Sequence, residues 1–135
     1  MKTILMCHAE RPVADAVIER TAMLAEKFGA KVYVTSVAPV LHSRGGPIDP
    51  VDPPSTHERE ANDAVALLAE HGVSGAEPVV GIGDPADAIV HIADEHNVDL
   101  IVVGAHEGGV VSRLLRGAVG EEVARKAHAD VLIVH

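Results

Sequence analysis

A glycine-bearing segment, residues 102–123, carries the residue types and the spacing best suited to hold a ligand. It reads Val-Val-Gly-Ala-His-Glu-Gly-Gly-Val-Val-Ser-Arg-Leu-Leu-Arg-Gly-Ala-Val-Gly-Glu-Glu-Val. Gly104, Gly108 and Gly117 fall between an apolar run and a helical pattern. Glycines in such a place let backbone N–H groups turn toward an anion, and the helix dipole favours negative charge there. This pattern indicates phosphate binding, although tight turns use glycine in the same way.

Charged residues in the same segment could bind a ligand or could simply be exposed to solvent. Arg113 and Arg116 are three residues apart, so they could share a helical face and contact phosphate. Exposure to solvent explains both arginines equally well. Glu121 and Glu122 complement the dipole of the helix that they begin, and they need no catalytic role.

Nine histidines suggest a metal site, but their placement does not support one. Four of them lie on or at the ends of predicted helices, where exposed polar faces account for them: His57, His71, His91 and His96. The last two are five residues apart, so they do not share a face as an i, i+4 pair would. We therefore predict no metal site.

Two further histidines fall on loops that should converge. His8 and His106, with Glu107, would form either a hydrogen-bonded patch or a small metal-binding cluster, and the patch is the better expectation.

Cys7 is the only cysteine and lies in an apolar run, so we expect a buried thiol and no internal disulfide. No nucleophile–base–acid set with a recognisable local context occurs, and the protein is predicted not to be an enzyme.

Composition excludes several classes of partner. The net charge of −9 repels nucleic acid and anionic lipid, and Phe28 and Tyr33 are the only aromatic residues, so platforms for base stacking are missing. No stretch approaches the ~18 apolar residues of a membrane span. Residues 1–8 lead directly into a strand-like run without a secretion signal, so a cytoplasmic location is expected.

Extended and helical patterns alternate along the chain and must position these residues. Strands are predicted at 2–8, 31–37, 76–82, 99–103 and 131–134, and helices at 12–28, 57–71, 85–96 and 118–128. Gly29 and Gly72 end two of the helices, and Asp84 with Pro85 begins another. Residues 39–56 contain five prolines and two glycines, and we expect a long loop with no structure of its own.

This alternation predicts one α/β domain over residues 1–135, with a parallel sheet and helices on both of its faces. Ligands of such sheets bind beyond the carboxyl ends of the strands, where the strand order reverses. The rule points to the loops after the first strand (8–11), after the second (from Ala38) and after the fourth (104–117).

The chain resembles the universal stress protein family. In that family the loop after strand four has a glycine, two residues, a second glycine, nine residues, a third glycine and then Ser or Thr; Gly104 and Gly117 match the first and third glycines. Further similar segments are 25–30, 83–86 with Ile89 and Ala93, 99–102, 112–115, Glu121, and Val131 with Leu132. The resemblance implies an adenine-nucleotide alpha-hydrolase-like fold, a five-stranded sheet of order 3-2-1-4-5, cytoplasmic dimers and, in many members, bound ATP.

Three positions depart from the family at its nucleotide site. Glu107 replaces the second glycine, Ala118 replaces the hydroxyl residue, and Ala9 stands where nucleotide-binding members carry Asp. Two like charges ~4 Å apart at an effective dielectric constant of ~20 repel by about 4 kcal/mol, so Glu107 would oppose phosphate. The resemblance places the degenerate site on these residues: Ala9, Val37, Val40, Gly104, Glu107, Gly108, Arg113, Gly117 and Ala118. If Glu107 turns toward solvent, the backbone cradle survives.

The last strand, Val131, Leu132, Ile133 and Val134, is short and apolar, and we expect it at an edge of the sheet. An exposed apolar edge favours association, and the resemblance implies pairing across a two-fold axis in a homodimer.

The function expected from these observations is a stress-response or regulatory protein that binds without turnover and whose nucleotide site is degenerate. One alternative is a working ATP- or AMP-binding switch. Another is a slow nucleotide hydrolase, which the missing Asp and the missing Ser or Thr argue against. A third is an accessory subunit of a transporter or kinase, on which the sequence has no bearing.

Overall fold

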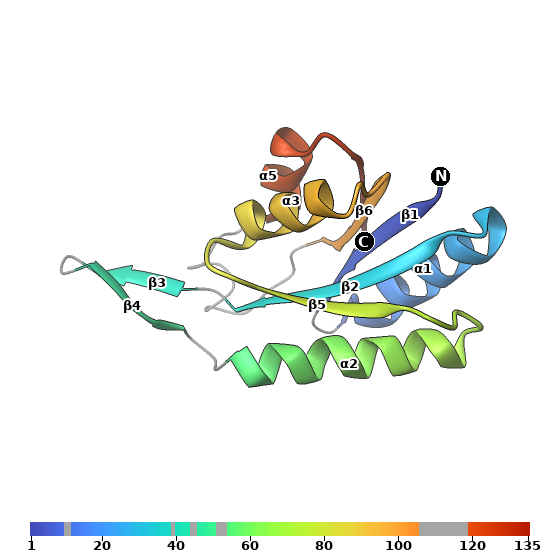
Figure 1. Ribbon diagram of the computed structural model, residues 1–135, viewed down its shortest axis with the longest axis horizontal. Coiled ribbons are helices and arrows are strands. Elements are labelled where there is room, and N and C mark those ends of the chain that lie inside the picture. Colours follow the sequence, from blue (N-terminus) through green and yellow to red (C-terminus); the bar gives the residue numbers. More distant parts are fainter. Residues whose placement is uncertain (10–11, 39, 44–45, 51–53, 106–118) are drawn as a thin grey trace.

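The computed structural model describes residues 1–9, 12–38, 40–43, 46–50, 54–105 and 119–135 (Figure 1). Its strands are β1 Thr3–Cys7, β2 Lys31–Ala38, β3 Val40–Ser43, β4 Gly46–Pro50, β5 Glu77–Ile82, β6 Leu100–Gly104 and β7 Asp130–Val134. Its helices are α1 Ala14–Phe28, α2 Pro54–Glu70, α3 Pro85–Glu95 and α5 Val119–Lys126.

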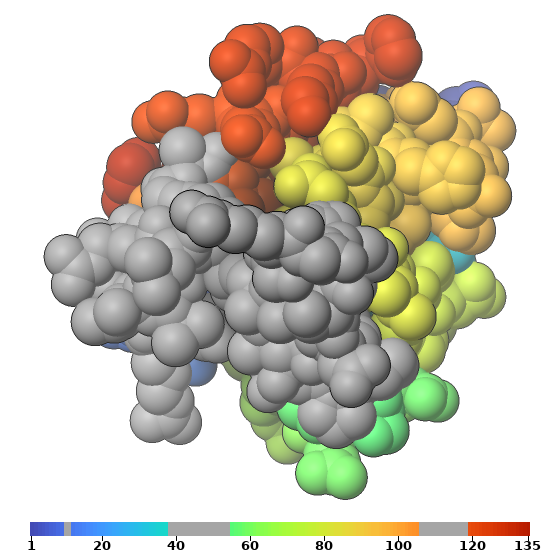
Figure 2. All heavy atoms as spheres, turned by 90° about the vertical axis from the view of Figure 1, so that its left-hand side faces the viewer, coloured from blue at the N-terminus to red at the C-terminus, as the bar shows by residue number. Residues whose placement is uncertain are grey.

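Five parallel strands form the main sheet in the order β5-β2-β1-β6-β7. Counted along the chain within this sheet, the order is 3-2-1-4-5, which confirms the predicted fold. Helices α1 and α2 lie on one face and α3 and α5 on the other (Figure 1). In Figure 2, which turns the β3–β4 end toward the viewer, α5 (red) and α2 (green) lie at opposite edges of the molecule.

Alternation along β1 divides the core into two layers. Ile4 and Met6 belong to the layer under α1 and α2, and Leu5 and Cys7 belong to the layer under α3 and α5. All four side chains are buried. A strand covered on both faces reads as a continuous apolar run because neither set of alternating side chains reaches water.

Helix ends follow the sequence signals in part. Gly29 ends α1 in the left-handed conformation with φ of 64°, and the Asp84 carboxylate accepts a hydrogen bond of 3.0 Å from the N–H of Asp87. Helix α1 begins at Ala14, so Pro12 precedes it and does not lie in its first turn. Helix α2 begins at Pro54, one turn earlier than predicted.

The expectation of an unstructured loop over 39–56 is wrong. Strands β3 and β4 pair antiparallel in a separate two-stranded sheet, in which Val40 lies opposite Pro50 and His42 opposite Pro47. Proline lacks an N–H and is excluded from central strands, but each strand of a two-stranded sheet has one free edge that tolerates it.

Strand β7 lies at an edge of the main sheet, as predicted. The N–H of Asp130 bonds to the carbonyl of Asp99, and the carbonyl of Val134 accepts from Ala105. Since the N–H and C=O of one strand residue point to the same side, and the side alternates along a strand, the backbone groups of Val131 and Ile133 point away from β6. The Val134 side chain is only 1% exposed.

Asp99 ties the start of β1 to the start of β6. Its carboxylate accepts hydrogen bonds from the backbone N–H groups of Lys2 at 2.8 Å and Thr3 at 3.0 Å. These bonds, first that of Lys2 and then that of Thr3, lower the pKa of the Asp99 carboxyl from its ordinary value. The contribution to stability is therefore complete above the unfolded-state pKa of ~3.9 and is lost as the pH falls through the folded-state value.

We expect Asp99→Asn to unfold at lower urea concentration than the unmodified protein at pH 7, with the difference shrinking as the pH falls below about 4. The amide cannot supply the charge that strengthens both hydrogen bonds. Urea unfolding followed by circular dichroism at several pH values measures this difference. Asp130→Asn is the control, because within the described residues its carboxylate makes no hydrogen bond. A difference for Asp99→Asn that does not vary with pH would contradict the assignment.

Candidate functional site

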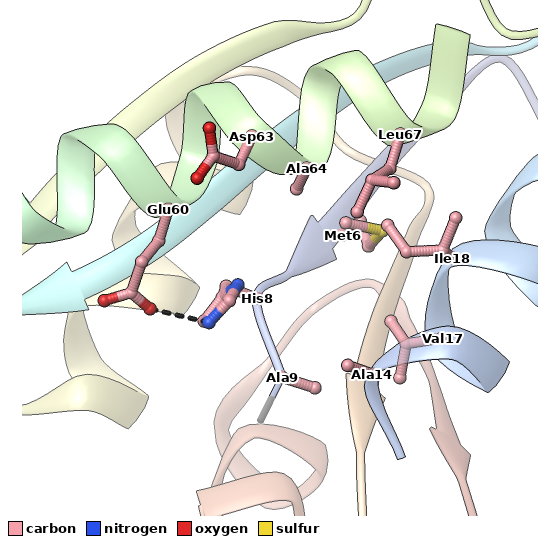
Figure 3. A pocket seen from close by; sticks show the side chains of 10 residues that line it. All are labelled: Met6, His8, Ala9, Ala14, Val17, Ile18, Glu60, Asp63, Ala64 and Leu67. Atoms are coloured by element: carbon pink, nitrogen blue, oxygen red, sulfur yellow. Dashed lines mark ion pairs between the residues drawn. The ribbon is translucent and has the colours of Figure 1, made fainter. Parts of the chain in front are cut away.

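A pocket of about 110 Å³ opens between α1 and α2 at the carboxyl end of β1 (Figure 3). Its lining residues come from these three elements and from the two residues after β1: Met6, His8, Ala9, Ala14, Val17, Ile18, Glu60, Asp63, Ala64 and Leu67. This is the end of the sheet at which the strand order predicts ligand binding.

The pocket has an apolar floor and a polar side. Met6 lies on β1 and is 1% exposed, and the side chains of Ile18 and Leu67 converge on it from the two helices (Figure 3). His8 and Glu60 approach each other on the polar side, with Nε2 of His8 2.6 Å from Oε2 of Glu60. The pocket therefore offers apolar contact and carboxylate oxygens to the same ligand.

Four side chains connect β1, β2 and α2 beside the pocket. Oε1 of Glu60 lies 3.6 Å from Nδ1 of His57, and Ser36 Oγ and His57 Nδ1 share a hydrogen bond of 2.8 Å. Both Ser36 and His57 are buried. The Glu60 carboxylate therefore lies between His8, which it contacts directly, and His57.

The expectation that His57 lies on an exposed polar face is wrong. Helix α2 begins three residues before this histidine, so His57 lies inside its first turns and faces β2. His71 and His91 are exposed, as expected. Within the described residues, no three His, Cys, Asp or Glu side chains are arranged to hold a metal ion.

Sequence reasoning missed Ser36, Glu60 and Asp63. The spacing of His57, Glu60 and Asp63, three residues each, was the available signal, because residues three and four apart share a helix face. The same turns of α2 carry the buried Ala61, Ala64 and Leu68. Reading that face as polar at its start and apolar further on would have identified the polar side of the pocket.

The structure describes only part of the predicted nucleotide site. Ala9 lines the pocket. Val37 packs in the layer under α3, on the opposite face of the sheet, and Val40 begins β3. The remaining predicted positions of the glycine-bearing segment lie outside the described residues: His106, Glu107, Gly108, Arg113, Arg116, Gly117 and Ala118.

Gly104 lies at the end of β6 against the start of α1. A Cβ atom at this position would come 2.8 Å from Val13 Cγ1, 3.0 Å from Ala9 Cβ and 3.3 Å from Val17 Cγ2. Real Cβ contacts are not shorter than about 3.0 Å, and crowding of this kind typically costs ~1–3 kcal/mol. Packing alone therefore favours glycine here, whatever the loop binds.

Cys7 is a core residue, as predicted. It is buried in the layer under α3 and α5, and burial raises the pKa of its thiol to about 12. A thiol with so high a pKa stays protonated at neutral pH and is a poor nucleophile.

None of the described helices is long and apolar enough to cross a membrane.

Comparison with known proteins identifies relatives over the whole chain. The model of the universal stress protein family matches residues 1–135. A universal stress protein from Thermus aquaticus is 31% identical over 139 aligned residues, with 98% of each chain covered. Universal stress protein Rv1636 from Mycobacterium tuberculosis is 39% identical over 74 residues, which are 55% of this chain and 51% of the relative. The alignment thus spans about half the length of that relative.

Two solved structures of universal stress proteins share the fold, and each is a complex with an adenine nucleotide. A universal stress protein from Archaeoglobus fulgidus in complex with dAMP superimposes with a TM-score of 0.70 at 25% identity, covering 100% of this chain and 98% of the other. A universal stress protein in complex with cAMP gives a TM-score of 0.71 at 27% identity, covering 99% and 97% of the two chains.

Proposed function

Because this chain belongs to the universal stress protein family, we propose that it acts in the stress response by binding, without catalytic turnover, and that its adenine-nucleotide site is weakened. Ala9 is the observation that carries this proposal. It lines the pocket at the end of β1, where nucleotide-binding members of the family carry Asp, and its methyl group offers no hydrogen-bond acceptor.

Two further positions support a weakened site. Glu107 replaces a family glycine and brings a negative charge toward a polyanion, and Ala118 cannot donate the hydroxyl hydrogen bond that Ser or Thr would. The buried Cys7 thiol and the absence of a recognisable nucleophile–base–acid set in the sequence support binding over catalysis.

We expect ATP with Mg²⁺ to bind more weakly than about 100 μM at moderate salt, a free energy of binding of about −5.5 kcal/mol. A carboxylate near phosphate and the loss of two polar partners account for this weakness. Isothermal titration calorimetry measures the affinity, and titration of dAMP into the protein from Archaeoglobus fulgidus is the positive control for the measurement. A low-micromolar dissociation constant with one site per chain would refute the proposal.

An AMP-dependent switch is the second candidate. The solved relatives in complex with dAMP and cAMP support it, because both of those ligands carry a single phosphate. A monophosphate has fewer charges for Glu107 to repel than ATP has. In the same calorimetric experiment, AMP binding at least tenfold tighter than ATP binding would favour this candidate.

We also propose that the protein is a cytoplasmic homodimer that pairs through β7. The strand lies at the edge of the sheet, and the backbone groups of Val131 and Ile133 point away from β6. Unpaired edges of this kind favour strand addition, and two copies related by a two-fold axis would pair antiparallel and satisfy these groups.

A further inference from the structure

His8 is the single basic side chain among the described residues that line the pocket between α1 and α2. Its backbone N–H donates a hydrogen bond of 2.7 Å to the carbonyl of Thr35, which fixes the residue at the carboxyl end of β1. Its Nε2 atom lies 2.6 Å from Oε2 of Glu60, and each of these two side chains is 27% exposed. The imidazole is therefore held between the sheet and α2 while part of its surface stays open to solvent.

The contact with Glu60 determines which ring nitrogen of His8 carries a proton. An ionised carboxylate only accepts hydrogen bonds, so Nε2 must be the donor. In the neutral imidazole the other nitrogen, Nδ1, is then an acceptor, and after protonation it becomes a donor. Nδ1 is turned away from Glu60 (Figure 3) and makes no hydrogen bond within the part of the chain that the structure describes. Protonation therefore changes what His8 offers to a ligand in the pocket.

Protonation of His8 also changes the charge of the pocket. The other titratable side chains of the lining are Glu60 and Asp63, both from α2, and His57 lies beyond Glu60 at 3.6 Å. The lining residues from β1 and α1 are apolar, and β2 adds the neutral Ser36 next to His57. The two carboxylates leave the lining with two negative charges while His8 is neutral, and with one net negative charge once it is protonated. An anionic ligand is therefore repelled less by the protonated pocket.

We propose that nucleotide binding in this pocket is linked to the uptake of one proton by His8, so that an adenine nucleotide binds more tightly as the pH falls from 8 to 6. An imidazole changes its charge within this range. The inference rests on the proposed function, because it assigns a mode of regulation to the same nucleotide site. A site that is weak at pH 8 would then fill on acidification, and the protein would respond to pH as well as to nucleotide concentration.

The test uses cAMP, which a relative of known structure binds. Its phosphodiester keeps one negative charge at every pH used, whereas a terminal phosphate such as that of AMP gains a proton near pH ~6. The full unmodified chain is titrated at pH 6 and pH 8 in about 0.15 M salt, which screens distant charges. ¹H–¹⁵N NMR follows the backbone amides of Ala9 and Ala64. We expect the dissociation constant to fall by at least about fivefold from pH 8 to pH 6, within the limit of about a hundredfold for one linked proton.

Two histidine variants separate His8 from the other titrating groups. His8→Gln keeps hydrogen-bonding groups but cannot take up a proton, so its affinities for cAMP at the two pH values should agree within about twofold. His91→Gln is the matched control, because His91 also lies beside a glutamate, with Nε2 3.4 Å from Oε1 of Glu95, but on α3 on the other face of the sheet. This control should retain the pH dependence of the unmodified protein.

Calorimetry on the unmodified protein gives a second measurement that needs no variant. Titration of cAMP at pH 7 in two buffers with different enthalpies of ionisation reports the number of protons taken up with each ligand. We expect a net uptake, because linkage requires the ligand to favour the protonated form of His8 as much as protonation favours the ligand.

The possible failures are distinguishable. Equal affinity for cAMP at the two pH values, a pH dependence that persists in His8→Gln, or binding without proton uptake would overturn this inference and leave the nucleotide site in place. If cAMP shifts no amide of the pocket at either pH, the assignment of the pocket to a nucleotide is wrong, and the inference is wrong with it.

Discussion

Replacing Val131 with proline is expected to convert the proposed β7-paired dimer into a monomer that remains folded. The N–H of Val131 points away from β6, so proline at this position leaves the β6–β7 hydrogen bonds in place. Each copy in a two-fold pair would lose one donor and leave one facing carbonyl unsatisfied. At ~1–3 kcal/mol for each unsatisfied group, the dimer would lose about 2–6 kcal/mol, which raises its dissociation constant from about thirtyfold to more than ten-thousandfold.

Sedimentation equilibrium at tens of micromolar protein measures the outcome. Val131→Thr is the matched control, because it keeps the backbone donor and the branched shape and should remain dimeric. Lysine at Leu132 or Val134 is a poorer test of the interface. Val134 is already buried within one chain, so a charge there would unfold the monomer. A monomeric unmodified protein, or a dimeric Val131→Pro variant, would refute pairing through β7.

Combining Ala9→Asp, Glu107→Gly and Ala118→Ser is expected to tighten ATP binding by at least tenfold, with Glu107→Gly contributing most. Glu107 brings a repulsive charge, whereas the two alanines merely lack hydrogen bonds worth ~0.5–1.5 kcal/mol each. Glycine at position 107 would also allow the positive φ that a backbone phosphate site requires. Ala9 lines the pocket, so an aspartate side chain at this position has open space ahead of it.

Titration of ATP into the single, double and triple variants measures these contributions, and thermal unfolding verifies that each variant folds. The three positions share one ligand, so their effects should not simply add. Glu58→Gln controls for the loss of one negative charge at an exposed position. If the triple variant binds no better than the parent protein, the site differs from that of the family at more than these three positions.

The main sheet could be predicted from the sequence because its evidence is local. Each buried strand is an apolar run, and glycine or a capping residue marks the ends of the helices around it. The β3–β4 sheet could not be predicted in this way. Five prolines in 39–56 argue against strands in general. In the structure β4 pairs only with β3, with Val40 opposite Pro50. Each strand of this pair therefore has a free edge, where proline is tolerated.

The polar side of the pocket could be predicted only in part. The family pattern places Ala9 after the first strand, and in the structure Ala9 follows β1 and lines the pocket. Glu60 lies on α2 and contacts His8, which is distant in sequence, and His57. His57 is buried because α2 begins earlier than the sequence predicts. Contacts between side chains on different helices and strands leave no repeating hydrophobic pattern in the sequence of either element.

The crowding around Gly104 bears on how sequence signatures persist in evolution. A side chain at this position would crowd Val13 and Ala9, so packing favours glycine here even in a protein that binds no nucleotide. Positions such as Glu107 and Ala118, which carry no family residue here, are under no such demonstrated constraint. Gly104 by itself is therefore weak evidence for a bound nucleotide, and the residues at positions 107 and 118 bear more directly on which ligand this segment can bind.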